Sequence, residues 1–159
     1  MTMREATMRE ATIREAHPGD LPACAAIVND WVDEVDWLPR IMSREQTASL
    51  FGPDLLEKRT VLVADEDGAI LGYLSLDEAD AYIRALYLAP AARGRGIGKA
   101  LMDAAKARSP DGLSLGVFEP NRARAFYARE GFREVPEGRK GTHETEEGVA
   151  ELLMEWSPR

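Results

Sequence analysis

The segment from Leu86 to Leu101 reads LYLAPAARGRGIGKAL and joins an apolar, strand-like run to an amphipathic, helix-like run. Three glycines alternate in its centre, at positions 94, 96 and 98. Glycine lacks the side chain that would keep successive backbone N–H groups from turning toward one anion, and the following helix adds the positive end of its dipole. We therefore expect the loop from Arg93 to Gly98 to bind a pyrophosphate, with charge-assisted contacts from Arg93 and Arg95.

Other readings of the same loop fit less well. A Walker loop needs glycine at position 93 and serine or threonine at position 100, whereas the chain has Arg93 and Ala100. A dinucleotide fingerprint needs G-x-G-x-x-G within a βαβ unit, but the spacing here is G-x-G-x-G after an antiparallel-looking hairpin. A glycine-rich turn with incidental arginines does not explain why the glycines alternate directly ahead of a helix.

The composition of the whole chain limits the classes of protein that fit this loop. The 159 residues, 45% of them hydrophobic, favour one domain with one core. The formal net charge of −8 repels nucleic acid and anionic lipid, so neither is expected as a partner. Cys24 is the only cysteine, which excludes an intrachain disulfide and suggests a buried thiol in a reducing compartment. Without an apolar run of membrane-spanning length or a secretion signal, a cytoplasmic location is expected.

The chain before the loop predicts a strand, two helices and a hairpin. A five-residue repeat opens it, and we expect residues 1–11 to be an extended segment preceding a domain of residues 12–159. The expected elements of this half are a strand at 12–16, a helix capped by Asp20 and carrying a buried stripe, a loop at 33–40, a helix opened by the capping box Ser43–Gln46, and β-rich runs at 60–64, 69–76 and 81–88.

The remainder alternates helices with strands. We expect a helix from Ile97 to about Arg108, a strand at 113–118, a helix capped by Asn121 and ended by Gly131, and a strand at 150–156. The fold class that follows is α/β, in the broad sense that includes α+β. It is one mixed, mostly antiparallel sheet of about six to seven strands, flanked by helices.

Two segments resemble the GCN5-related N-acetyltransferase (GNAT) family. Residues Leu86–Leu101 are similar to its acetyl-CoA motif, Arg/Gln-x-x-Gly-x-Gly/Ala, which Arg93, Gly96 and Gly98 fill. Further along, the chain resembles the family's Asn-x-x-Ala-x-x-Phe-Tyr-x-x-x-Gly-Phe helix, although the alanine lies one place later than is common; the matching residues are Asn121, Ala125, Phe126, Tyr127, Gly131 and Phe132. The resemblance covers roughly residues 81–132.

The resemblance implies that acetyl-CoA is the cofactor. Backbone groups of Leu86 and Leu88 would pair with its pantetheine arm, in a slot left where the strand at 113–118 splays away. Asn121 would contact the cofactor beyond the pyrophosphate; the alternative, equally favoured, is that it only caps its own helix, and one side chain can serve both roles. Lys99 would point along the helix surface. The residues implied for cofactor binding are Leu86, Tyr87, Leu88, Arg93, Gly94, Arg95, Gly96, Ile97, Gly98, Lys99 and Asn121, with no metal.

Tyr127 is the candidate catalytic acid, because the leaving thiolate needs a proton and a phenol can supply one. The structural alternative is a half-buried tyrosine packed beside Phe126. The attacking amine must lose a proton, for which Asp80, Glu34 and Glu119 are candidate bases; each is individually better explained as a surface charge. In the segment 37–40, Trp37 and Arg40 are either substrate contacts or, for Trp37, hydrophobic cover. His17 and His143 are expected to be surface histidines.

The function that the resemblance implies is acetyl-CoA-dependent N-acetylation of a primary amine on a small molecule or peptide, by direct attack in a ternary complex. The alternative is a non-catalytic acyl-CoA-binding sensor or interaction module. The acceptor, the general base and the acyl group are not fixed by the sequence. The final strands offer a surface through which two copies can form a homodimer.

Overall fold

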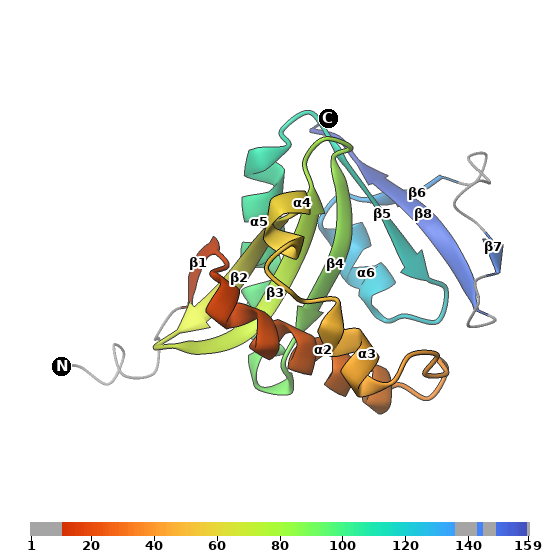
Figure 1. The fold of residues 1–159 in the computed structure, drawn as a ribbon. Coiled ribbons are helices and arrows are strands. Elements are labelled where there is room, and N and C mark those ends of the chain that lie inside the picture. Colours follow the sequence, from red (N-terminus) through yellow and green to blue (C-terminus); the bar gives the residue numbers. More distant parts are fainter. Residues whose placement is uncertain (1–10, 136–142, 145–148, 159) are drawn as a thin grey trace.

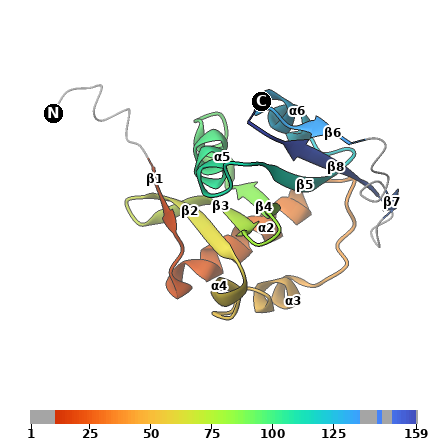
Figure 2. The same cartoon turned by 90° about the horizontal axis from the view of Figure 1, so that it is seen from above.

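The computed structural model describes residues 11–135, 143–144 and 149–158, which form one sheet covered by helices on both faces (Figures 1 and 2). The strands are β1 (Thr12–Glu15), β2 (Thr60–Glu66), β3 (Ala69–Asp77), β4 (Tyr82–Leu88), β5 (Leu113–Phe118), β6 (Arg133–Glu134), β7 (His143–Glu144) and β8 (Ala150–Trp156). The helices are α2 (Leu21–Glu34), α3 (Arg44–Ser49), α4 (Leu55–Lys58), α5 (Ile97–Arg108) and α6 (Ala123–Arg129). Residues 1–10 lie outside the described part, so the expected amino-terminal extension stays a prediction.

The sheet has the order β1-β2-β3-β4-β5-β8-β6, and β7 also pairs with β8. Pairing is antiparallel throughout except between β4 and β5, which run parallel. The prediction of a mixed, mostly antiparallel sheet of six to seven strands is therefore confirmed in the seven-strand path. The short β6 and β7 were not expected, and both form on the long edge that β8 offers.

The parallel pair β4–β5 separates soon after it begins. Its register joins Tyr82 to Ser114 and Ile83 to Leu115, at the start of both strands. Beyond Ile83, β4 continues to Leu88 along β3, while β5 continues to Phe118 along β8. The two strands therefore diverge toward their carboxyl ends, as expected for the slot at the strand 113–118.

A hydrophobic core lies on each face of the sheet. Alternate residues of β2 point to opposite faces, so that Leu62 packs with Leu101 of α5 while Val63 packs with Cys24 of α2. Figure 2 shows the same division, with α5 and α6 on one side of the strands and α2, α3 and α4 on the other. Burial on both faces explains why β2 and β3 read as continuous apolar runs.

One expected cap is wrong. Asp20 precedes α2, but its side chain makes no capping bond to that helix. Its carboxylate instead accepts from the Arg14 guanidinium at 2.8 Å and from the His17 backbone N–H at 2.7 Å. Asp20 thus ties β1 to the 3₁₀ turn Pro18–Asp20. The box Ser43–Gln46 does cap α3, with both of its bonds present.

Cys24 is fully buried in α2, as expected, and burial raises the pKa of its thiol to about 12. Because thiolate is the reactive form, we expect this thiol to react with a disulfide reagent near pH 8 roughly a thousandfold more slowly than an ordinary cysteine. A colorimetric exchange assay on the native protein measures this. The same assay in denaturant is the control, since unfolding must restore the ordinary rate; rapid labelling of the native protein would contradict the burial.

Candidate functional site

A cavity of about 980 Å³ opens where β4 and β5 diverge. Helix α2 and its following loop, β4, the loop into α5, and α6 all contribute walls. The lining residues are Trp31, Glu34, Val35, Asp36, Trp37, Leu86, Tyr87, Leu88, Ala92, Arg93, Gly94, Gly96, Ile97, Gly98, Lys99, Pro120, Asn121, Arg122, Ala123, Phe126, Tyr127, Arg129 and Glu130. This volume falls in the range of small-molecule and cofactor sites. The candidate acid Tyr127 lines it, and so does every residue expected from the sequence to bind the cofactor except Arg95.

The glycine loop presents backbone rather than side chains to the cavity. Gly94 and Gly96 have φ values of +75° and +79°, in the left-handed region that glycine adopts without strain. The first helical bond of α5 runs from the Ala100 N–H to the Gly96 carbonyl at 3.0 Å. The amides of Ile97, Gly98 and Lys99 precede it and have no acceptor within the helix. These amides and the helix dipole favour an anion at this point.

The charged side chains of the loop are held by carboxylates. Arg93 makes a two-pronged ion pair with Glu34, at 2.6 and 2.8 Å, and this hydrogen bonding lowers the pKa of the Glu34 carboxyl. Arg95 pairs with Glu66 of β2 and does not line the cavity. Lys99 lies on the surface of α5 with Glu130 and Asp103 each at 3.5 Å, as expected. Arg93 is therefore the loop arginine placed to reach a ligand.

Tyr127 and Asn121 lie on the side of the cavity formed by α6 and the turn before it. Tyr127 is 7% exposed and packs edge-on against Phe126 and Phe132, and burial raises the pKa of its phenol well above the usual value. The Asn121 side chain accepts from the Ala123 backbone N–H at 2.8 Å. Asn121 thus caps α6 as predicted, while the same residue lines the cavity.

The two ends of the cavity differ in charge. The α5–α6 end carries Lys99, Arg122 and Arg129, with Glu130 bound to Lys99. The opposite end, formed by α2, its following loop and β4, carries aromatic rings and two carboxylates. We call this second surface the aromatic–acidic wall; it consists of Trp31, Glu34, Asp36, Trp37 and Tyr87. The Arg93–Glu34 ion pair joins the glycine loop to this wall.

Several candidate residues lie elsewhere. Of the three carboxylates considered as bases, only Glu34 lines the cavity. Asp80 lies in the turn before β4, and Glu119, although next to the lining residue Pro120, is not part of the lining. Arg40, considered from the sequence as a substrate contact, does not line the cavity, and its guanidinium donates to Asn29, Asp33 and Met42. His17 is exposed, as expected, while the side chain of His143 lies outside the described residues.

Some lining residues were not singled out from the sequence. Trp31 follows the helical spacing of the apolar stripe Leu21, Cys24, Ile27 and Val28, which indicates a core residue, and Phe126 was noted only as part of a motif. Asp36 carries no signal beyond its place in the loop at 33–40. Within the described ranges, no group of three or more His, Cys, Asp or Glu residues is arranged to hold a metal ion. In the same part of the chain, no helix combines the length and apolar character that crossing a bilayer requires.

Comparison with known proteins agrees with this geometry. Residues 57–134 match the family model described as an acetyltransferase (GNAT) domain. The peptidyl-lysine N-acetyltransferase YiaC of Escherichia coli is 43% identical over 74 residues, which is 46% of this chain and 49% of that protein. The chain spans about half the length of the curated relatives it matches.

Solved structures extend the similarity to nearly the whole chain. The solution structure of apo YjaB from Escherichia coli matches with a TM-score of 0.72 and 25% identity, over 92% of this chain and 97% of that one. A phosphinothricin acetyltransferase from Sinorhizobium meliloti, solved in complex with acetyl-CoA, matches with a TM-score of 0.69 over 93% of this chain and 88% of that one. Its 23% identity speaks for the fold alone.

Proposed function

This chain carries an acetyltransferase domain of the GNAT family, and we propose that it transfers an acetyl group from acetyl-CoA to a primary amine. The observation that carries the proposal is the cavity between the diverging strands, entered by the glycine loop and the amino terminus of α5. A diphosphate fits the loop amides, and an extended arm fits the free edge of β4. The chain therefore offers sites for both the charged and the extended parts of acetyl-CoA.

Each part of the cofactor has proposed partners. The loop amides from Gly94 to Lys99 and the Arg93 guanidinium bind the pyrophosphate. Backbone groups of Leu86 and Leu88 hydrogen-bond the pantetheine arm as an added strand, because β4 lacks a partner on that edge beyond Ile83 in the described register. Asn121 contacts the cofactor from the start of α6. In this proposal the thioester lies near Tyr127, which lines the same cavity.

The chemistry is a direct transfer. The neutral amine nitrogen attacks the acetyl carbonyl carbon and the C–N bond forms. The C–S bond then breaks, the nitrogen loses a proton to water, and the sulfur leaves with the electron pair and takes up a proton in exchange. Since burial keeps the Tyr127 phenol protonated, we assign it the role of hydrogen-bond donor to the departing sulfur. The buried Cys24 thiol takes no part, so no acyl-enzyme forms.

The test is a screen of primary amines with acetyl-CoA, read as release of free thiol, together with calorimetric titration of coenzyme A. We expect micromolar or tighter binding and thiol release with at least one class of amine. Binding without release for every amine would instead support the alternative, a sensor or interaction module that binds acyl-CoA. No binding of coenzyme A would overturn both.

The Arg93–Glu34 ion pair gives a testable effect on cofactor affinity. Because Glu34 and a phosphate would use the same guanidinium, Glu34→Gln should strengthen coenzyme A binding by roughly two- to fivefold, the range of an exposed ion pair. Calorimetry measures this. Glu66→Gln is the matched control, since it frees Arg95, which lies outside the cavity. Equal affinity for Glu34→Gln and the unchanged protein would show that the carboxylate does not compete.

A further inference from the structure

The aromatic–acidic wall is a continuous surface rather than a set of isolated side chains. The Trp31 ring lies 5.7 Å from Trp37 and 5.0 Å from Tyr87, measured between ring centroids. Trp37 also contacts Phe118 of β5 at 5.9 Å, so the aromatic surface reaches across the opening between β4 and β5. Glu34 and Asp36 lie within one or two helical turns of Trp31 in the chain, and both line the same cavity.

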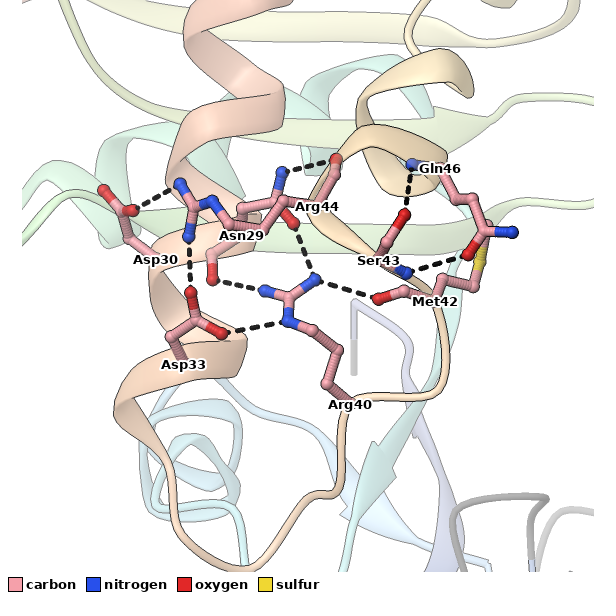
Figure 3. A network of polar contacts seen from close by, with 8 residues as sticks. All are labelled: Asn29, Asp30, Asp33, Arg40, Met42, Ser43, Arg44 and Gln46. Carbon is pink, nitrogen blue, oxygen red and sulfur yellow. Dashed lines mark hydrogen bonds and ion pairs between the residues drawn. The ribbon is translucent and has the colours of Figure 1, made fainter.

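The loop that carries Asp36 and Trp37 is fixed to α2 by a polar network (Figure 3). Arg40 donates to the Asn29 carbonyl at 2.8 Å, to the Asn29 side-chain oxygen at 2.9 Å and to Asp33 at 2.9 Å. The Asn29 amide in turn donates to the Arg44 carbonyl at 3.1 Å, at the start of α3. Asn29 is 4% exposed, so the bonds that it makes are partly shielded from water. A loop held in this way presents its side chains without first having to order them.

The charges of the wall restrict what it can bind. Glu34 is bound to Arg93, but Asp36 has no ion-pair partner among the described residues. An ammonium group is attracted electrostatically by the Asp36 carboxylate and by the faces of the indole rings. A carboxylate carried next to that ammonium is repelled by Asp36. The rings also offer apolar area, which an acceptor without a hydrocarbon stem leaves uncovered.

We propose that the acceptor is a primary alkylammonium on an apolar stem of several carbons, with no carboxylate beside the amine. Asp36 binds the ammonium and the Trp31 and Trp37 rings cover the stem. The inference rests on the proposed function, which it narrows to one class of amine. The same chemistry is offered by a free alkylamine and by a lysine side chain within a peptide, and the experiment below distinguishes these two sources.

The first arm compares substrates that differ in one group. Pentylamine and ethylamine differ in stem length, while norleucinamide and norleucine differ in the charge beside the amine. We expect kcat/KM to fall roughly tenfold or more from pentylamine to ethylamine and from norleucinamide to norleucine. A peptide with one internal lysine and a blocked amino terminus tests the second source: a higher kcat/KM than pentylamine's assigns the acceptor to peptides, and a lower one assigns it to free amines.

The second arm uses variants of the wall. Asp36→Asn should raise KM for pentylamine by roughly tenfold with little change in kcat, and Trp37→Leu should raise it for pentylamine much more than for ethylamine. Asp111→Asn, which removes a carboxylate outside this cavity, is the matched control and should change neither constant. Titration of each variant with coenzyme A checks that the cofactor site is intact.

The outcomes separate this inference from the proposed function. Thiol release that is equal for norleucine and norleucinamide, or an unchanged KM in Asp36→Asn, overturns the alkylammonium assignment and leaves the acetyltransferase activity standing. If coenzyme A binds but no amine releases thiol, the proposed activity fails instead. The wall is then tested by tryptophan fluorescence: quenching by pentylamine that Asp36→Asn weakens supports it, and the absence of quenching overturns it.

Discussion

Replacing Tyr127 with phenylalanine is expected to lower kcat by about 10²- to 10³-fold while coenzyme A affinity stays within about twofold. The change keeps the ring contacts with Phe126 and Phe132 and removes only the phenol oxygen. Negative charge develops on the sulfur as the C–S bond breaks, and a donor at that point stabilises the transition state more than the bound substrate. Steady-state thiol release, compared with calorimetric binding, separates the two effects.

Two controls sharpen this result. Tyr82→Phe removes a phenol on β4 that does not line the cavity and keeps the ring beside Arg84, so it should leave turnover unchanged. The pH profile is the second control. Because burial raises the pKa of Tyr127, its protonated form persists up to at least about pH 10, and its ionisation should cause no loss of activity below that pH. Full turnover in Tyr127→Phe would remove the residue from the mechanism.

Replacing Gly98 with leucine is expected to weaken coenzyme A binding by roughly a hundredfold or more, measured by calorimetry. A Cβ at this position would meet Phe126 at 3.5 Å and Leu88 at 3.6 Å, which are ordinary contacts. A longer side chain therefore has to project into the cavity, over the amides that the diphosphate would use, or displace the Phe126 ring.

Gly98→Ala is the matched variant. Its single added methyl group fits the space, and alanine favours the helix, so binding should persist and stability should rise by about 0.5–1 kcal/mol. Thermal unfolding of both variants shows whether the fold is retained. Coenzyme A affinity in a folded Gly98→Leu protein that equals that of Gly98→Ala would mean that the loop is not the diphosphate site.

The elements that the sequence predicted best are those bounded by clear turn chemistry. The bounds of α5, β5 and β8 match the expected ranges, because Gly96, the Ser109–Gly112 turn and the apolar runs mark their ends. The β2–β3 hairpin also forms as expected, with Asp67 and Gly68 at φ values of +53° and +90°. A two-residue strand such as β6 is too short to show a hydrophobic alternation in the sequence. Such a strand could not be predicted, because it forms only by pairing with the edge of β8.

Partners of charged groups were the least predictable part of the site. Arg93 and Glu34 are 59 positions apart, and Asn29 and Arg40 are 11 apart across a loop. No local pattern relates such pairs, since tertiary packing decides which charges meet. The backbone conformation of the glycine loop was predictable because its requirement for positive φ is local. That Asp36 lines the cavity and Arg95 does not depends on how α2 and β2 pack against the loop.

The brief contact between β4 and β5 has a consequence for the mechanics of the molecule. In the described register, only two residue pairs, Tyr82–Ser114 and Ile83–Leu115, connect strands β1 to β4 with strands β5, β8 and β6. A ligand that lies along β4 would form the inter-strand hydrogen bonds that are missing there. It would therefore serve as an added strand of the sheet and as a reactant at the same time. Ligand binding would then also make the contact between the two parts of the sheet more rigid.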